Sequence, residues 1–140
     1  MLDLILATAL LQAADPCHAA DGPPGGAGCP SWREIWRGDR GVLSADPASL
    51  RPGGDSFEIR IRFVYAEAFP SGIRTITSVM RMDCTARIGA RRNGVAYATD
   101  GTRLQEEDPA APPTTMPVDA DGPEDALLAE YCPRGGTPDA

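Results

Sequence analysis

The sequence predicts an α+β domain: an antiparallel β-sheet of about six strands, arranged as a meander, with a C-terminal α-helix packed on one face. Three observations lead to this prediction. An alternating segment at 57–65 is followed by further β-forming segments that short turns separate. One convincing helical segment comes near the end of the chain. One cysteine ends a predicted strand and another lies in that helix, so we expect a disulfide to join helix and sheet.

The length of the chain, 140 residues, is enough for one domain. Its 15 glycines and 14 prolines are concentrated in a few stretches, which are typical of loops, linkers and tails. We therefore predict a folded domain over 32–133. A flexible Gly/Pro-rich lead-in at 20–31 precedes this domain, and a disordered tail at 134–140 follows it.

The first residues form an apolar stretch that ends near Leu11. It is too short to cross a bilayer but has the length of the apolar part of a secretory signal peptide. We predict a signal peptide over 1–19, with cleavage within 14–20. Cleavage after Ala19 fits the small-residue rule better than cleavage after Ala14, but it removes Cys17. The alternative is a buried N-terminal helix of a cytosolic protein, and four cysteines in a small, loop-rich chain favour export.

The first strands are predicted from bulky and β-branched residues. The segment 32–36 brings the first large apolar side chains and predicts one strand, and 41–44 predicts a second, short one. The segment 46–50 follows as a turn, because Asp46 and Ser49 are placed to bond the local backbone.

Two long strands form the clearest part of the prediction. In 57–65 one face carries the apolar residues Phe57, Ile59, Ile61, Phe63 and Tyr65. The other face carries the charged residues Glu58, Arg60 and Arg62. Such alternation is typical of a half-buried antiparallel strand. A second strand is predicted over 73–84, with Ile76, Met80, Met82 and Cys84 on its core face. Its opposite face carries Ile73, Thr75, Thr77, Val79 and Arg81.

Two dipeptides then predict tight hairpin turns. Asn93-Gly94 and Asp100-Gly101 both tolerate the positive φ angles of such turns. Residues 57–105 are therefore predicted to form a meander of four or five strands.

A proline-rich segment, 106–122, is predicted to cross the surface as an irregular loop. A short helix follows it. Pro123 suits the first turn of that helix, and either Asp121 or Gly122 can cap it. Its apolar side carries Leu127, Leu128, Tyr131 and Cys132 at helical spacing.

The four cysteines allow three pairings. Cys84 closes the core face of a predicted strand and Cys132 lies on the apolar side of the predicted helix, so we expect these two to pair. Cys17 and Cys29 would then form a second disulfide. A zinc site is the alternative, but no C-x-x-C spacing supports it.

Several classes of function are disfavoured by composition. A net charge of −7 argues against a general nucleic-acid binder. The only histidine, His18, lies in or beside the predicted signal peptide, so the mature domain is not expected to hold a Ser-His-Asp or Cys-His site. Asp119 and Asp121 lack the spacing of a calcium loop and are read as solvated charge. We therefore expect no enzymatic activity, no metal and no cofactor.

Charge is unevenly distributed along the chain. From Phe57 to Arg103 there are eight arginines and four acids, whereas from Gln105 onward there are nine acids and one arginine. A basic sheet face partly neutralised by an acidic tail would explain this. The alternative is a basic patch that recognises an anionic partner through forked hydrogen bonds. The residues proposed for such a patch are Arg60, Arg62, Arg74, Arg91 and Arg92.

Several short motifs occur in a characteristic order: Asp46-Pro47-Ala48-Ser49-Leu50, then Asp83-Cys84-Thr85-Ala86-Arg87, Tyr97 with Gly101, and Cys132. In this order and spacing the chain, over 32–133, resembles the surface-adhesin E (protein E-like) family of Gram-negative bacteria. The resemblance implies an antiparallel sheet of about six strands with a C-terminal helix tied to it by a disulfide. It also implies an exported protein of the periplasm or outer cell surface.

Two functions are expected from these features. The first is an exported, non-enzymatic binding protein that engages a protein or an anionic polymer at the cell envelope through its polar sheet face. The second is a structural protein of the periplasm with no dedicated ligand. No transmembrane helix is expected in the mature chain.

Overall fold

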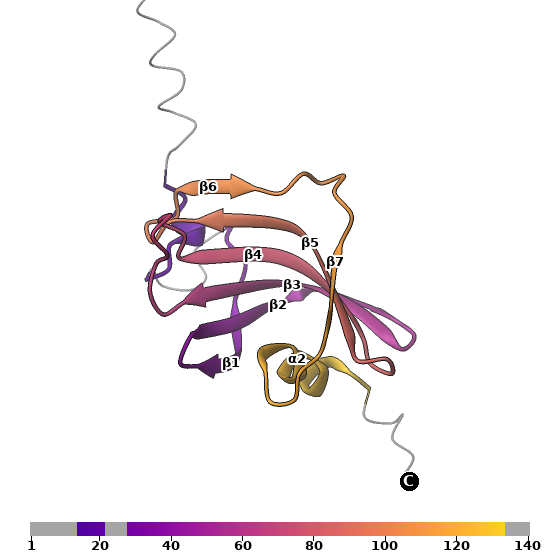
Figure 1. Ribbon diagram of the computed structural model, residues 1–140. Helices are drawn as coiled ribbons and strands as arrows, with labels where there is room; N and C mark the ends of the chain where they lie inside the picture. The colour runs from indigo at the N-terminus through magenta and orange to yellow at the C-terminus, as the bar shows by residue number, and fades with distance from the viewer. Residues whose placement is uncertain (1–13, 22–27, 134–140) are drawn as a thin grey trace, which may run out of the picture.

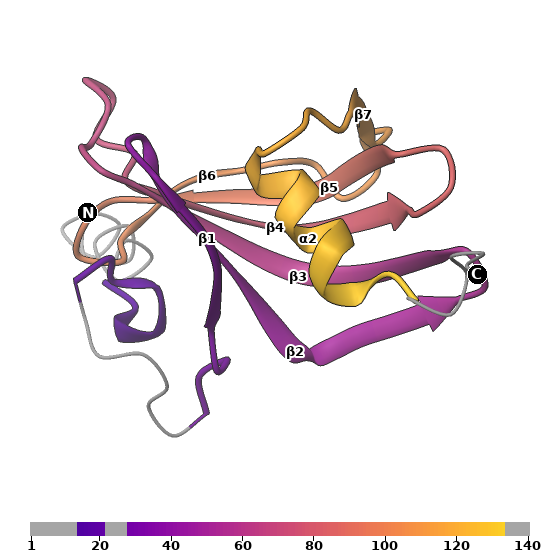
Figure 2. The same ribbon diagram turned by 90° about the horizontal axis from the view of Figure 1, so that it is seen from below.

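A computed structural model of the protein describes residues 14–21 and 28–133. Within these ranges, seven strands form one antiparallel sheet, and helix α2 (Pro123–Tyr131) lies on one of its faces (Figures 1 and 2). This confirms the predicted fold class. Part of the predicted signal peptide (1–13), part of the lead-in (22–27) and the predicted tail lie outside the described residues. No helix in the described ranges is both long and apolar enough to span a membrane.

Six strands follow one another in space in the order of the chain. They are β1 (Arg33–Gly38), β2 (Gly41–Gly53), β3 (Ser56–Tyr65), β4 (Thr75–Asp83), β5 (Ile88–Tyr97) and β6 (Arg103–Glu106). The predicted meander therefore comprises four strands, β3 to β6. The seventh strand, β7 (Thr114–Pro117), returns to pair with the first half of β5. It lies on the same side of β5 as β6, which pairs with the second half.

The register of β3 and β4 establishes the two faces of the sheet. Ile59 lies opposite Met80, and Phe57 lies opposite Met82. All four side chains are at most 3 % exposed. We call this side the inner face and the side of Glu58 the outer face. The alternation predicted for both strands is confirmed.

Helix α2 completes the core on the inner face. It begins at Pro123 after the N-cap Gly122, and acidic residues occupy its first turn, where they favour the positive end of the helix dipole. Leu127 and Leu128 are 0 % and 4 % exposed against the inner face. The predicted disulfide between Cys84 and Cys132 links the end of β4 to the end of the helix.

One predicted turn lies within a strand. The segment 46–50 belongs to β2, whose pairing with β3 is interrupted between Asp46 and Arg51. The expected local bonds are present: the Ala48 amide donates to the Asp46 carboxylate (3.2 Å), and the Ser49 hydroxyl donates to the Asp46 carbonyl (2.7 Å). They bend the strand locally without reversing the chain.

The Asn93-Gly94 hairpin was a wrong prediction. Both residues lie inside the continuous strand β5 and together oppose the single residue Ser78, because the register shifts between Thr77 and Val79. Asn93 has a φ of 57°. The same tolerance for positive φ that favours a hairpin turn therefore serves a β-bulge here. The second predicted hairpin, at Asp100-Gly101, is present.

The prediction of an irregular loop over 106–122 was also wrong in part, because β7 lies within it. Its prolines do not prevent pairing, since β7 is short and lies at the edge of the sheet, where one side of its backbone needs no partner.

The N-terminal segment packs on the outer face. Cys17 and Cys29 form the second predicted disulfide. Beside it, the His18 ring stacks on the Tyr97 ring at a centroid distance of 4.2 Å. The Ala20 amide donates to the Thr99 carbonyl at 2.9 Å. The segment 14–21 is therefore fixed against the β5–β6 turn by backbone and side-chain contacts.

Candidate ligand-binding site

Helix α2 is too short to cover the whole inner face. Its nine residues are about 13.5 Å long, whereas the apolar row of β3 from Phe57 to Tyr65 extends about 26 Å. The helix packs over the end that contains Phe57 and Ile59. The other end of the inner face therefore has no helix above it.

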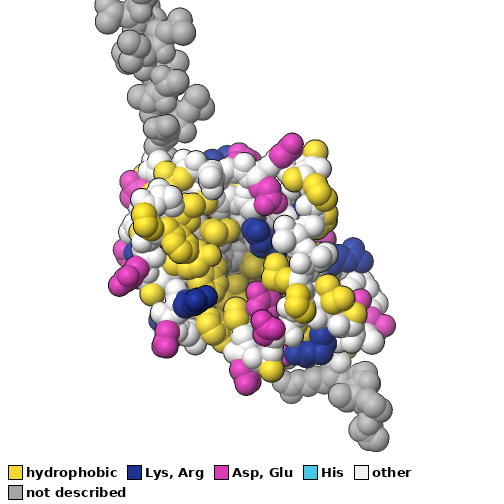
Figure 3. Space-filling model, in the orientation of Figure 1, with side chains coloured by type: hydrophobic (Ala, Val, Ile, Leu, Met, Phe, Trp, Pro, Cys, Tyr) yellow, Lys and Arg dark blue, Asp and Glu magenta, His cyan; other side chains and the backbone are white. Residues whose placement is uncertain are grey.

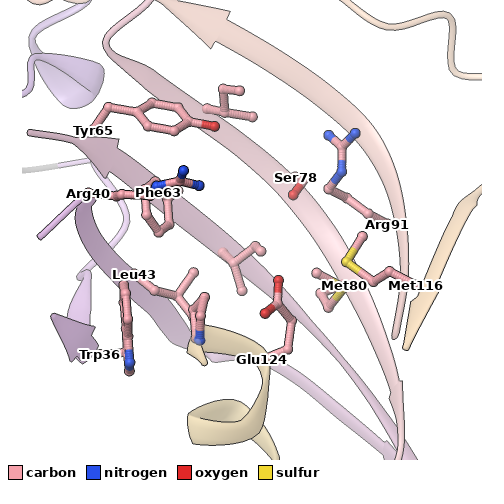
Figure 4. A pocket seen from close by; sticks show the side chains of 13 residues that line it. Trp36, Arg40, Leu43, Phe63, Tyr65, Ser78, Met80, Arg91, Met116 and Glu124 are labelled. Atoms are coloured by element: carbon pink, nitrogen blue, oxygen red, sulfur yellow. The ribbon is translucent and has the colours of Figure 1, made fainter. Parts of the chain in front are cut away.

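A pocket of about 430 Å³ lies over this uncovered end. Figure 3 shows it as a hollowed patch of hydrophobic side chains with basic side chains beside it. Most of its lining is apolar: Trp36, Leu43, Ile61, Phe63, Tyr65, Ile76, Met80, Met116 and Pro123. Its polar members are Arg40, Ser78, Arg91 and Glu124 (Figure 4). Size and composition are those of a small-molecule site, which is typically an apolar hollow with a few polar groups.

Aromatic rings form one wall of the pocket. Phe63 and Tyr65 follow each other on the inner face of β3, with ring centroids 4.9 Å apart. Trp36 of β1 approaches Phe63 to 6.4 Å, and Phe69 approaches Tyr65 to 4.6 Å. The indole of Trp36 donates to the carbonyl of Asp121 at 3.2 Å, which connects this wall to the segment before the helix. The wall is thus positioned independently of any ligand.

Polar groups meet at the side of the pocket formed by β4 and β5. Ser78 and Arg91 lie on these neighbouring strands, and Figure 4 shows their side chains close together. Ser78 is 5 % exposed, and its hydroxyl forms no hydrogen bond within the described ranges. The bulge beside Ser78 lies next to the gap between β6 and β7.

Arg91 is half-buried and has no carboxylate within 4.0 Å among the described residues. Glu107 lies close to it: Nη1 of Arg91 and Oε2 of Glu107 both approach the position that a Cβ of Gly94 would take, at 3.0 and 3.4 Å. Glu124 lies at the helix side of the pocket (Figure 4). A guanidinium in a partly apolar setting is stabilised by a bonded anion, and residues 14–21 and 28–133 supply none to Arg91 within 4.0 Å. The pocket therefore has a positive site for an anion at the Arg91 end and a negative group at the helix end.

The five predicted arginines do not share one face. Arg91 lies opposite Met80 on the inner face, whereas Arg92 lies opposite Val79 on the outer face. Successive residues of a strand point to opposite sides, so grouping these two was a mistake that the alternation rule already excluded. Arg92 forms an ion pair with Glu58 at 2.6 Å. Arg74 donates to the Tyr65 carbonyl beyond the end of β3.

The remaining two predicted arginines lie on the outer face. Arg60 is exposed and lines a shallow hollow of about 290 Å³ that Arg51 and Arg92 also line. Arg62 is half-buried, with its guanidinium carbon 5.9 Å from the centre of the Trp32 ring. Burial lowers the pKa of Arg62. Arg60, Arg62 and Arg92 therefore share the outer face, where Arg60 and Arg92 line one hollow, and Arg91 lies on the inner face.

The sequence contains a signal for the pocket that the prediction of the fold did not include. The apolar row of the 57–65 strand is about twice as long as the predicted nine-residue helix, so part of it must be uncovered or covered by something else. The position of Arg91 beside Ser78 gave no such signal in the sequence. That position depends on the bulge in β5 and on the pairing of β7.

The lining includes no histidine and no cysteine. A mostly apolar lining with a guanidinium, a hydroxyl and a carboxylate is suited to binding an amphiphilic molecule. No protein-family model and no curated protein matches the sequence.

Proposed function

We propose that this protein is an exported, non-enzymatic binding protein that takes a small apolar or amphiphilic molecule into the pocket between α2 and the sheet. The uncovered inner face carries the proposal. The rings of Trp36, Phe63 and Tyr65 and the side chain of Ile76 remain partly exposed there, above a floor of buried aliphatic side chains.

Export is supported by the two disulfides, since such bonds persist in oxidising compartments. The resemblance to the surface-adhesin E family leads us to propose the periplasm or outer surface of a Gram-negative bacterium. The open pocket favours binding over the alternative of a structural envelope protein, for which a covered inner face would suffice.

The proposal is tested with the neutral fluorescent probe N-phenyl-1-naphthylamine, which brightens in apolar surroundings. We expect saturable binding to the oxidised, folded protein. Ile76→Trp should fill the pocket and weaken binding at least roughly tenfold, because the added ring occupies the space of the probe.

The matched control is Val79→Trp, which adds the same ring to the same strand on the outer face. It should leave probe binding unchanged. Two results would refute the pocket as the binding site and favour a structural role. One is the absence of saturable probe binding, and the other is an equal loss of probe binding in both variants when their thermal stabilities are equal.

A second candidate function is recognition of an anionic polymer by the outer face. It is favoured by the hollow where Arg51 and Arg60 are exposed and have no acidic partner within 4.0 Å in the described part of the chain. Dextran sulfate should then bind at low salt, and the double change Arg51→Ala and Arg60→Ala should abolish binding. Arg40→Ala, which removes one arginine at the inner-face pocket, is the control. Binding that does not depend on salt or on these two arginines would exclude this candidate.

A further inference from the structure

We infer that the pocket recognises an anionic amphiphile with one charged head group: the head group lies at Arg91 and Ser78, and an aliphatic body lies over β4, β3 and β2. This inference rests on the proposed function, because it names the class of molecule that the same pocket takes. The observation behind it is that the half-buried Arg91 and the buried Ser78 lie together at the β4–β5 side of a mostly apolar lining, whereas the exposed Arg40 and the half-buried Glu124 lie on its other sides.

The Arg91 side of the pocket is built for an anion. Arg91 presents several N–H donors to the pocket, and no carboxylate of the described residues lies within 4.0 Å of it. Ser78 adds a hydroxyl donor from the neighbouring strand. A carboxylate or sulfate placed between them would receive charge-assisted hydrogen bonds and would compensate the lost hydration of the guanidinium.

The apolar part of the lining determines the body of the ligand. From β5 to β2 the pocket crosses three strand spacings, roughly 14 Å. Along this path the floor and wall are formed by Ile76, Ile61, Phe63 and Leu43. These side chains offer no hydrogen-bonding group, so a flexible hydrocarbon chain matches them better than a sugar or a peptide.

The surrounding charges limit the ligand to a single anionic group. Glu106 and Glu107 line the hollow on the far side of Arg91, and Glu124 lies at the helix side of the pocket. The chain as a whole has a net charge of −7. A polyanion would bring further negative groups near these carboxylates, whereas a single head group at Arg91 avoids them.

The test compares two ligands that differ only in the head group. Dodecanoate and dodecanol, both below the concentrations at which they aggregate, are titrated against bound N-phenyl-1-naphthylamine. We expect dodecanoate to displace the probe at roughly 10- to 100-fold lower concentration, as one charged hydrogen-bonded pair would give. Arg91→Gln should reduce this preference to near unity and leave displacement by dodecanol unchanged.

The control variants are Arg81→Gln, which removes an exposed arginine of the outer face, and Arg40→Gln, which removes the other arginine of the pocket. Both should retain the preference for dodecanoate. Equal displacement by the acid and the alcohol would overturn the inference while the proposed function stands. Loss of the preference in Arg40→Gln but not in Arg91→Gln would overturn the placement of the head group. Failure of the neutral probe itself to bind would refute the proposed function.

Discussion

At the scale of single residues, Gly101 determines how closely the N-terminal segment can approach the sheet. It has a φ of 91°, and a Cβ atom there would overlap the carbonyl oxygen of Asp15. The Asp15 amide donates to the Gly101 carbonyl at 3.2 Å. No other residue type combines this conformation with so close a backbone approach.

We predict that Gly101→Ala destabilises the protein and detaches residues 14–21. Gly54→Ala is the matched control, because Gly54 also has a positive φ of 67° but has open space around its Cβ position. The control should cost about 1–2 kcal/mol through backbone strain alone. Gly101→Ala should cost at least about 1 kcal/mol more. Denaturant unfolding measures both, and equal costs would contradict the close packing.

Protonation of His18 makes the free energy of unfolding depend on pH. Its ring is stacked on Tyr97, and burial lowers the pKa of His18 below its usual value of 6.5. The charges of Arg60, Arg62 and Arg103 act in the same direction, whereas Asp15 opposes them. The folded protein therefore binds a proton on His18 less readily than the unfolded chain does.

The sign of the resulting effect follows from linkage. Above pH 6.5 the ring is neutral in both states and its contribution to stability is complete. As pH falls from 6.5 through the lowered pKa, the unfolded state binds the proton first and stability is lost. Unfolding free energies of the native protein and of His18→Gln, measured at several pH values from 7.5 down to 5, should diverge most at neutral pH. Parallel curves would contradict a neutral, buried ring.

At the scale of elements, the two disulfides lie on different faces of the sheet: one joins α2 to the end of β4, and the other closes the N-terminal segment on itself. Cys84–Cys132 closes 48 residues and holds α2 on the inner face, and Cys17–Cys29 closes 12 residues at the outer face. Replacing each pair by serines should therefore have separable consequences.

We predict that the Cys84→Ser and Cys132→Ser double variant loses about 4 kcal/mol, and the Cys17→Ser and Cys29→Ser variant about 3 kcal/mol, from chain entropy. Only the first should weaken binding of N-phenyl-1-naphthylamine, because α2 borders the pocket. Unfolding in denaturant and probe titration measure the two effects. A loss of probe binding in the second variant alone would contradict this assignment of the faces.

Elements with a strong local signal were predictable from the sequence, and those that depend on distant pairing were not. The alternation of 57–65 and the Pro123 start of the helix fixed β3 and α2 closely. Asn93-Gly94 allows both a hairpin turn and a bulge, and only the continuous pairing of β4 with β5 selects the bulge. The same dependence on partners explains why β7 was missed, whereas the alternation rule alone excludes placing Arg91 and Arg92 on one face.

At the scale of the whole molecule, residues 14–21 are part of the folded unit. Ala14 forms a bridge with Thr102, Ala20 bonds Thr99, and Cys17 is in a disulfide. Removal of 1–19 would delete most of these contacts. We therefore predict that the mature chain retains Asp15, Cys17 and Ala20, so that cleavage after Ala14, which removes only the bridge of Ala14, is used in preference to cleavage after Ala19.

The intact mass and the N-terminal peptide of protein recovered from the envelope check this prediction. The mass should include two disulfides and the peptide should contain Cys17. An N-terminus at Ala20, with Cys29 carrying a free thiol, would contradict it.

The order of the strands has a consequence for how the molecule assembles. From β1 to β6 every strand pairs with its neighbour in sequence, so the sheet can grow from any hairpin by closing short loops. The N-terminal segment and α2 do not pair with a strand that is next to them in the sequence. Each reaches its face of the sheet through contacts with residues that are distant in the chain. Both disulfides of the protein involve these two late-closing ends, and neither joins two strands of the central sheet.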